Sequence, residues 1–259
     1  AKKSNRVAAE GLIGITVKNN SGAMIEINSE TDFVARNELF QNFVKTCSEL
    51  VLSTKNDIDA LQNLPFPNAN RSVSEELINN IATIGENMNI RRAEYLDVSR
   101  GVLISYVHNS VAEGLGRLGV LVALETGVQN NDIKEIGKQI AMHIAATSPK
   151  SLNIEDLDSE LVERERQILI DQAISSGKPK EIAEKIVQGR MHKFFQEVVL
   201  NEQVSVIDGE TKIKDLIKRT SLEFKTEIKI KGFKVLKLGE GVQIEDSDFA
   251  AEVAATAGL

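Results

Sequence analysis

The chain has 259 residues, 42% of them hydrophobic, which is enough to fold around one large core or two to three smaller ones. Its 31 basic and 38 acidic residues give a formal net charge of -7, which disfavours binding to nucleic-acid phosphates or anionic lipid. No stretch approaches the length of a membrane span, and no hydrophobic signal segment follows the basic N-terminus. We therefore expect a cytoplasmic protein that binds neither nucleic acid directly nor a membrane.

The first predicted unit is a β-hairpin followed by two helices and a strand. Apolar residues at 11–18 and 23–27 flank turn-forming residues at 19–22, which predicts the hairpin. A helix is expected from about Thr31 to Leu52, because apolar residues recur there at helical spacing. The remaining expected elements are a proline-containing loop at 63–68, a second helix from Ser72 or Ser74 to about Gly85 with Leu77, Ile78, Ile81 and Ile84 on its inner side, and a strand ending near Val98.

The start of the first helix, at residues 28–37, combines capping, acidic and aromatic side chains. Ser29 or Thr31 can cap the free N–H groups of the helix, and the acidic neighbours suit its positive end. Phe33 lies one heptad before Phe40 on the same side of the helix. Spacing alone therefore places Phe33 in the core, where phenylalanine is usually found.

The second predicted unit repeats the first. Strands at 101–107 and 118–124 precede a helix at about 131–146, in the same order as the opening hairpin and helix. Within this repeat, the apolar residues 23–27 align by eye with residues 121–125. The order and the alignment together predict two related subdomains.

Two charged, amphipathic helices interrupt the second unit. The first runs from about Leu157 to Ile174, and the glycine and proline within residues 175–179 end it and start the second. Two such helices joined by a short turn predict an antiparallel hairpin. The pattern leaves two arrangements open, which are an arm that projects from the body and a hairpin packed flat on the core.

The predicted fold class is α+β, with two related hairpin-plus-helix subdomains that have antiparallel sheets, a projecting antiparallel helical hairpin and a C-terminal helix. A strand at 226–238 is expected to join the second sheet. The last helix, at 248–257, has a narrow apolar stripe that must dock on this protein or on a partner. The expected domains are an N-terminal core subdomain at residues 1–100, a C-terminal core subdomain at residues 101–154 and 201–241, the helical hairpin at residues 155–200 and the C-terminal helix at residues 242–259.

The sequence contains no recognisable catalytic or metal-binding pattern. His108, His143 and His192 lie in separate elements without partners at metal-ligand spacing, and Cys47 lies on the apolar stripe of a helix. The run at 114–119 matches GxGxxG but precedes a strand, whereas a dinucleotide-binding loop follows a strand and opens a helix. We expect no enzymatic reaction, no cofactor and no metal. We also expect His143 in the core and His108, in a turn at a strand end, to face a partner.

The segment TDFVARN at residues 31–37 resembles the signature of the elongation factor Ts family, the bacterial and organellar nucleotide exchange factors for elongation factor Tu. Other family-like segments follow in the order of the family over almost the whole chain. They are VAAEGLI at 7–13, IGENMNIRR at 84–92, RLGVLV at 117–122, IAMHIAA at 140–146, SGKPKEIAEKIVQGRMHKF at 176–194 and DFAAEVAA at 248–255.

The resemblance implies that the chain binds elongation factor Tu, in its GDP-bound and nucleotide-free forms, and promotes the release of GDP. By this similarity Asp32 and Phe33 reach the GTPase domain of the partner near its Mg²⁺ and phosphate site. Ile84, Gly85 and His108 complete the surface that faces this domain. The implied contacts to the C-terminal β-barrel domain of the partner are Val206 and Ile207.

Two features depart from the family pattern. Family members usually begin with a small helical domain that is absent from this chain, and the sequence leaves open whether the chain is a fragment of a longer protein. The turn at 109–116 also looks longer than the usual tight connection. The alternative function is a non-catalytic protein-binding scaffold that uses the helical hairpin, and the sequence leaves open a homodimer through the core or the hairpin.

Overall fold

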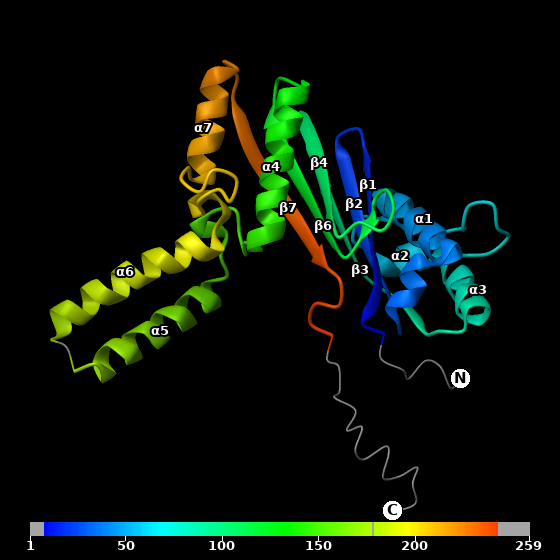
Figure 1. Cartoon of the computed structure of the whole chain (residues 1–259), viewed down its shortest axis with the longest axis horizontal. Helices are drawn as coiled ribbons and strands as arrows, with labels where there is room; N and C mark the ends of the chain where they lie inside the picture. The colour runs from blue at the N-terminus through cyan, green and yellow to red at the C-terminus, as the bar shows by residue number, and fades with distance from the viewer. Residues whose placement is uncertain (1–7, 178, 243–259) are drawn as a thin grey trace, which may run out of the picture.

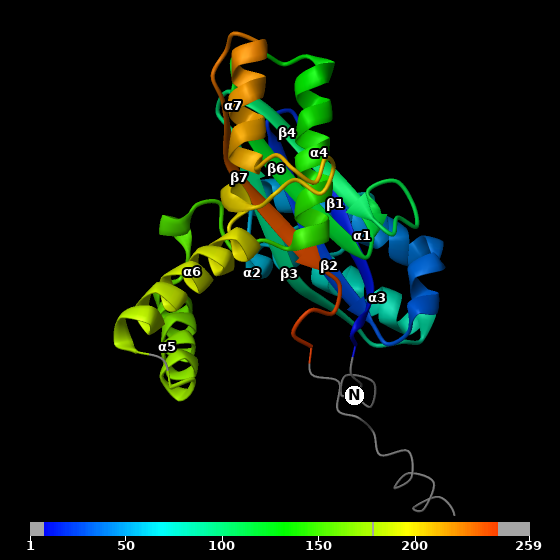
Figure 2. The ribbon, with the colours of Figure 1, turned by 60° about the vertical axis from the view of Figure 1, so that its left-hand side comes forward.

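The computed structural model describes residues 8–177 and 179–242, which form four layers (Figures 1 and 2). Two antiparallel sheets pack face to face in the middle, and helices cover the outer face of each sheet (Figure 1). The predicted α+β class with antiparallel sheets is therefore confirmed. Across the described ranges, no helix is both long enough and apolar enough to cross a membrane.

The first sheet has the strand order β3-β2-β1-β5, and the pairing of β1 with β2 confirms the predicted hairpin. Most residues of β1 and β2 are buried on both faces, under α1 on one side and the second sheet on the other, which explains the largely apolar sequence of these two strands. The sequence did not predict α2. The elements are β1 (Glu10–Lys18), β2 (Ser21–Ser29), β3 (Met88–Asp97) and β5 (Leu115–Gly116), with α1 (Glu38–Thr54), α2 (Ile58–Asn63) and α3 (Val73–Ile84).

The start of α1 differs from the prediction. A separate 3-10 helix, η1 (Asp32–Arg36), precedes it, and Asn37 caps α1 by accepting two hydrogen bonds from backbone N–H groups of the first turn. The predicted caps, Ser29 and Thr31, are wrong. The hydroxyl of Ser29 donates to the backbone of Thr31, and the hydroxyl of Thr31 donates to the carboxylate of Glu86.

The second helix of this unit, α3, begins and ends as predicted. Ser72 forms a reciprocal capping box with Glu75, and Gly85 ends the helix in the left-handed conformation at a φ of 90°. Ile78 was expected on the inner side but is 65% exposed, because it lies outside the stripe that packs on the core. This stripe consists of Val73, Leu77, Ile81 and Ile84.

The second sheet has the strand order β4-β6-β7, and β7 pairs antiparallel with β6 as expected. On its outer face, α4 packs against β4 and β6 while α7 packs against β7. Together these helices enclose a second hydrophobic core. The elements are β4 (Gly101–His108), β6 (Leu118–Thr126), β7 (Ile228–Lys237), α4 (Asn131–Thr147) and α7 (Ile213–Glu223).

The internal repeat is visible in the backbone. Gly11 and Gly101 lie at the starts of equivalent strands and have positive φ values of 122° and 153°. At both positions a carbonyl oxygen of the paired strand lies so close that a side chain with a Cβ would clash with it. A bulge follows Glu26 in the first sheet and Ala123 in the second, so these residues correspond. The alignment by eye is wrong by one residue, because it matched Glu26 with Leu124. Uniformly apolar strands carry no mark of register.

The helical hairpin, hereafter the arm, consists of α5 (Ser159–Ser175) and α6 (Lys180–Val198). Figures 1 and 2 show that it extends away from the sheets, so the flat-packed alternative is wrong. At its base the N–H of Lys150 donates to the carbonyl of Val198 at 2.7 Å. The arm has a small core of its own, made by Leu169, Ala173, Ala183, Val187 and Met191.

A buried carboxylate ties the chain after β7 to the first sheet. Glu26 is fully buried and accepts hydrogen bonds from the N–H of Gly239, at 2.8 Å, and from the side chains of Asn28 and Arg92. Burial raises the pKa of Glu26, but these bonds outweigh it and hold the pKa below its ordinary value. The predicted C-terminal helix at 248–257 lies outside the described residues.

Candidate protein-binding site

The candidate site begins with an exposed phenylalanine on a short, anchored turn. In η1, Val34 and Ala35 are buried, whereas Phe33 is 77% exposed and Asp32 beside it is exposed as well. The core placement expected from heptad spacing is wrong, because η1 ends before α1 begins and does not continue its helical phase. A large exposed aromatic side chain on a fixed backbone is typical of protein-binding surfaces.

Two acidic side chains hold η1 against the end of α3. Glu86 accepts hydrogen bonds from the backbone N–H of Thr31 at 2.9 Å and from its hydroxyl at 2.6 Å. In the opposite direction, Glu30 accepts a hydrogen bond from the N–H of Asn87 at 2.6 Å. These reciprocal, charge-assisted bonds fix the two segments relative to each other.

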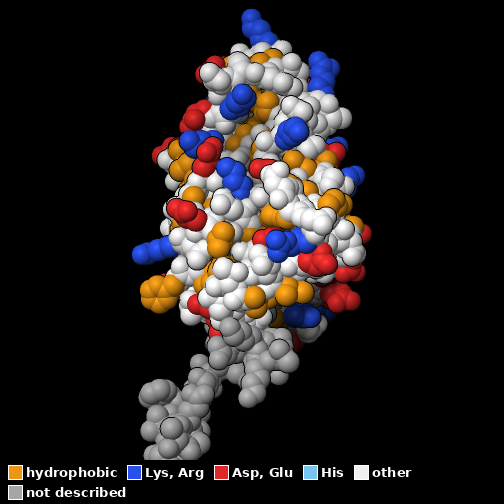
Figure 3. Space-filling view, turned by 90° about the vertical axis from the view of Figure 1, so that its right-hand side faces the viewer, with side chains coloured by type: hydrophobic (Ala, Val, Ile, Leu, Met, Phe, Trp, Pro, Cys, Tyr) orange, Lys and Arg blue, Asp and Glu red, His pale blue; other side chains and the backbone are white. Residues whose placement is uncertain are grey.

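This fixation brings four of the predicted contact residues together. Ile84 and Gly85 directly precede Glu86 in the sequence. Glu86 binds Thr31, which directly precedes Asp32 and Phe33. Ile84 is half-buried and packs partly on the core, so it has both a structural contact and an accessible part. On the face shown in Figure 3, apolar side chains are scattered among basic and acidic ones.

His108 lies at the same end of the sheets as η1. It ends β4, and its carbonyl accepts a hydrogen bond from the N–H of Arg117 at 3.3 Å. The guanidinium of Arg117 in turn lies 2.8 Å from the carboxylate of Glu10, which pairs in the sheet with Ser29, just before η1. The structure therefore connects His108, through Arg117 and Glu10, to the strand end that precedes η1.

The turn at 109–116 leaves His108 exposed. It folds back on the edge of the first sheet, where β5 pairs with β1 and the carbonyl of Gly114 accepts the N–H of Ile15 at 2.8 Å. The imidazole is oriented by Tyr106, whose hydroxyl lies 3.2 Å from Nδ1 of His108. Part of this turn thus forms β5, the fourth strand of the first sheet, and the turn does not cover the side chain of His108.

A second candidate patch lies on the loop at residues 203–213, hereafter the Val206 loop. Its exposed aliphatic side chains are Val206 and Ile207, each 50% exposed, and Val204, which is 43% exposed. The loop closes on itself, because the N–H of Ser205 donates to the carbonyl of Thr211 at 2.8 Å. These aliphatic side chains are therefore presented on a defined backbone.

The tip of the Val206 loop is an Asp-Gly turn. The carboxylate of Asp208 accepts hydrogen bonds from the N–H groups of Glu210 and Thr211, at 3.1 and 3.0 Å, and Gly209 takes a positive φ of 71°. Hydrogen bonds from Thr211 and Glu210 lower the pKa of Asp208 to about 2. The carboxylate that shapes this turn therefore stays ionised at neutral pH.

A buried histidine supports the Val206 loop from below. His143 is fully buried in α4, where its Nδ1 accepts the backbone N–H of Val206 at 3.2 Å and its Nε2 lies 2.9 Å from Oε1 of Gln203. Burial lowers the pKa of His143, against a smaller effect of the bond to Gln203. The prediction of a hydrogen-bonded core histidine is confirmed.

The two patches belong to different layers of the molecule. The cluster of Asp32, Phe33, Ile84 and Gly85 lies between the helical layer and the lower end of the first sheet, whereas the Val206 loop packs on α4 over the second sheet (Figure 1). The structure thus brings most of the predicted contact residues to one place but leaves Val206 and Ile207 in a separate patch.

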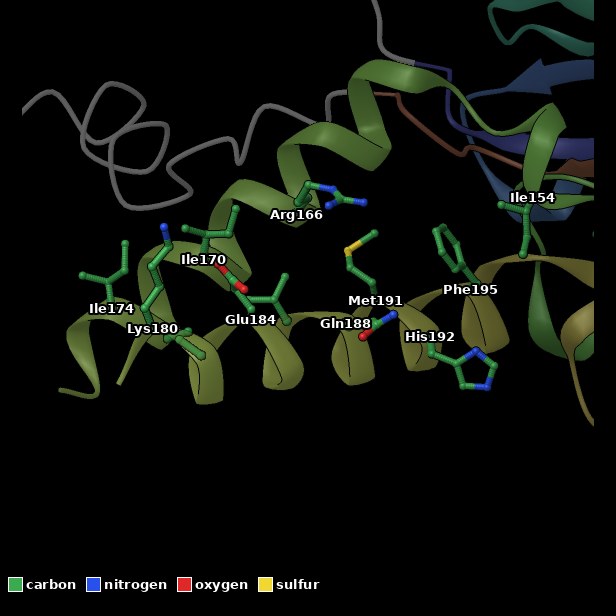
Figure 4. A pocket seen from close by; sticks show the side chains of 13 residues that line it. Ile154, Arg166, Ile170, Ile174, Lys180, Glu184, Gln188, Met191, His192 and Phe195 are labelled. Atoms are coloured by element: carbon green, nitrogen blue, oxygen red, sulfur yellow. The ribbon is translucent and has the colours of Figure 1, made fainter. Parts of the chain in front are cut away.

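The arm carries a third feature, a groove of about 970 Å³ along its two helices. In Figure 4, Met191 and Phe195 point from α6 toward the space beside α5, whereas His192 points away from it. Ile174, at the far end, is 68% exposed. The groove also contacts the charged side chains of Arg166, Lys180 and Glu184.

Neither a cluster of metal ligands nor an accessible thiol occurs among the described residues. Within residues 8–177 and 179–242, no three His, Cys, Asp or Glu side chains gather as metal ligands. Cys47 is fully buried, and burial raises the pKa of its thiol far above the ordinary value. This thiol is a core group rather than a nucleophile, as its position on the helix predicted.

Comparison with known proteins gives a consistent result. A family model described as Elongation factor TS matches residues 30–240. An elongation factor Ts from Rhodospirillum centenum is 53% identical over 258 residues, which cover 100% of this chain and 84% of that protein. The elongation factor Ts proteins of Rhodospirillum rubrum and Gluconobacter oxydans are each 49% identical, over 98% and 100% of this chain and 83% of each relative.

The fold, the exposed aromatic turn and these likenesses place the chain among the translation elongation factors. More narrowly, it belongs to the elongation factor Ts family, a family of nucleotide exchange factors in translation elongation. The resemblance seen in TDFVARN and the other segments is thereby confirmed.

Sequence reasoning missed the residues that hold the contact segments in place. Nothing in the sequence marks Glu86 as the partner of Thr31, because the two are far apart in the chain and neither belongs to a regular pattern. Val204 was also missed, although its neighbours in the Val206 loop were named. For His143 a signal exists, since a histidine on the inner stripe of a helix needs a polar partner.

Proposed function

We propose that this chain is a guanine nucleotide exchange factor for elongation factor Tu that binds both the GDP-bound and the nucleotide-free partner. Membership of the elongation factor Ts family supports this assignment. The single structural observation that carries it is the 77% exposure of Phe33 on a turn fixed by hydrogen bonds. A factor of this kind catalyses no covalent step and acts through binding alone.

In this proposal Asp32 and Phe33 insert near the Mg²⁺ and phosphate site of the partner. The phenyl ring wedges between partner helices and holds a conformation in which Mg²⁺ is poorly coordinated and the phosphate-loop peptide is displaced. The anchoring of η1 supports this mechanism, because a turn that is already ordered loses little entropy on binding. Ile84, Gly85 and His108 complete the surface toward the GTPase domain.

The Val206 loop supplies the second contact. Val206 and Ile207 face the C-terminal β-barrel domain of the partner, and their exposure on a closed loop suits this role. Two contacts on separate layers of the molecule hold two partner domains at once. The factor thereby favours one arrangement of those domains over another.

Linkage sets the direction of the effect. A factor that binds the nucleotide-free partner more tightly than the GDP complex must weaken GDP binding by the same ratio. Faster release of GDP additionally requires a ternary complex of factor, partner and GDP. Exchange is therefore measured as a rate and as a shift in GDP affinity.

The test follows the release of a fluorescent GDP analogue from purified elongation factor Tu. We expect micromolar amounts of this chain to accelerate release, and the double variant Asp32→Ala, Phe33→Ala to lose most of the acceleration. A chain that leaves the release rate unchanged, while folded by thermal melting, contradicts the proposal.

A scaffold function of the arm is the second candidate, favoured by the groove beside Met191 and Phe195. It predicts that the double variant at Asp32 and Phe33 keeps full function and that deletion of the arm abolishes it. Such a deletion is feasible because residues at the base of the arm, Ser151 and Val199, already pair with each other. The exchange proposal predicts that the double variant loses activity.

A further inference from the structure

One hydrogen bond ties the exposed part of the Val206 loop to the body of the second subdomain. The loop closes on itself through the bond from Ser205 to Thr211 and through a second from the N–H of Gly209 to the carbonyl of Ser205, at 2.9 Å. The bond from the N–H of Val206 to Nδ1 of His143, in contrast, crosses to α4. This bond therefore holds the backbone of Val206, whose side chain is exposed.

The proton positions on His143 follow from its partners. A backbone N–H can only donate, so Nδ1 facing Val206 carries no proton. The proton of the neutral imidazole is therefore on Nε2 and is donated to Oε1 of Gln203 at 2.9 Å. Gln203 is itself oriented, because its Nε2 donates to the carbonyl of Glu197 at 2.7 Å.

From this geometry we infer that His143 is a positioning residue for partner binding, which acts by holding the Val206 N–H and so fixing how Val206 and Ile207 face the partner. The inference rests on the proposed function only for its effect on elongation factor Tu. Its effect on the loop is a property of the free chain. The two parts are tested separately.

Two substitutions of His143 separate the two ring nitrogens. The side-chain oxygen of His143→Asn lies where Nδ1 lies and keeps an acceptor for Val206, but cannot reach Gln203. The longer side chain of His143→Gln reaches the position of Nε2 and keeps a donor for Gln203, but leaves the Val206 N–H without its acceptor. Both variants replace a buried ring by a smaller amide, so the loss of packing is similar and the difference reports the bond.

The first measurement is hydrogen exchange of the Val206 amide in the free chain. Loss of one hydrogen bond of ordinary strength predicts exchange that is about fivefold to tenfold faster in His143→Gln than in His143→Asn. Equal exchange in the two variants overturns the inference, whatever the partner does.

The second measurement is the affinity for elongation factor Tu, taken from the concentration of this chain that gives half-maximal acceleration in the fluorescent GDP release assay. We expect His143→Gln to bind about fivefold more weakly than His143→Asn. In a background of Val206→Ala and Ile207→Ala, the difference between the two variants should shrink below about twofold, because His143 acts through those side chains. An undiminished difference in that background shows a general structural role and overturns the inference.

Loss of folding is checked by thermal melting of each variant. If His143→Gln does not fold, Gln203→Met serves instead, because it removes the acceptor that keeps the imidazole proton on Nε2. We then expect weaker partner binding and faster Val206 amide exchange, each by about twofold to threefold, and unchanged values overturn the inference. If the wild-type chain binds no elongation factor Tu, the proposed function fails, while the exchange of the Val206 amide still decides the positioning role.

Discussion

The two halves of the chain share one topology but use it differently. At the strand position next to the bulge, β2 of the first half holds the buried carboxylate of Glu26, whereas β6 of the second half holds Ala123. The predicted contact residues also lie at different connections, after β2 and α3 in the first half, and at the end of β4 and before α7 in the second. A duplicated framework can thus keep its backbone while each copy gains its own polar connections and its own exposed surface.

The largest predicted difference between the halves concerns Glu26. Glu26→Ala removes the buried carboxylate between the partly buried guanidinium groups of Arg91 and Arg92, so the free energy of unfolding should fall by about 3–5 kcal/mol. Urea denaturation measures this loss. As a control, Glu240→Ala removes an exposed carboxylate 3.5 Å from Arg92 and should cost less than about 1 kcal/mol. A loss that is equally small at Glu26 would show that the two halves do not differ at this position.

The next prediction tests what the halves have in common. Gly11→Ala brings a Cβ against the carbonyl oxygen of Ile27, and Gly101→Ala brings one against that of Leu124, in both cases on a backbone with positive φ. Each should lower the free energy of unfolding by about 2–4 kcal/mol, measured in the same way. Gly189 in α6 has no atom within 4 Å of such a Cβ, so Gly189→Ala should instead raise stability by about 0.5–1 kcal/mol.

The third prediction compares two phenylalanines one heptad apart, Phe33 with a proposed partner-contact role and Phe40 with a core role. Phe33→Ala should slow the GDP release that this chain stimulates from its partner roughly 30-fold, the effect of a contact of about 2 kcal/mol, while changing the free energy of unfolding by less than about 0.5 kcal/mol. Phe40→Ala, at a fully buried site, should cost about 3–5 kcal/mol of stability. A large loss of stability in Phe33→Ala would contradict the contact role and indicate that the ring packs in the core.

The smallest expected effect concerns the support of η1 in the first half. Glu86→Gln keeps an acceptor for Thr31 but loses the charge of the carboxylate, so stability should fall by about 1 kcal/mol. The stimulated release of GDP should slow about fivefold, less than in Phe33→Ala. Glu155→Gln, at an exposed site, is the control and should leave both quantities unchanged. If Glu86→Gln and Glu155→Gln had the same stability and the same rate of stimulated GDP release, Glu86 would not support η1.

The sequence predicted the elements whose patterns are local. Turn residues, caps and helical spacing predicted the hairpin, the ends of α3, and α4 with His143 in the core, and the structure contains all of them. The exposure of Phe33 was not predictable from spacing, because it depends on where one helix stops and another starts, and Asn37 decides that point. The connection between Glu86 and Thr31 depends on tertiary structure and has no local sign.

The base of the arm has a consequence for how the chain folds. Pairing of β6 with β7 joins Thr126 to Ile228, across a long stretch of chain that contains the whole arm. Once Lys150 has bonded to Val198, the arm no longer belongs to the loop that must close. The effective loop is then roughly half as long, which lowers its closure cost by about 0.6 kcal/mol. Early formation of the arm, from contacts close in sequence, should therefore speed the late pairing of the second sheet.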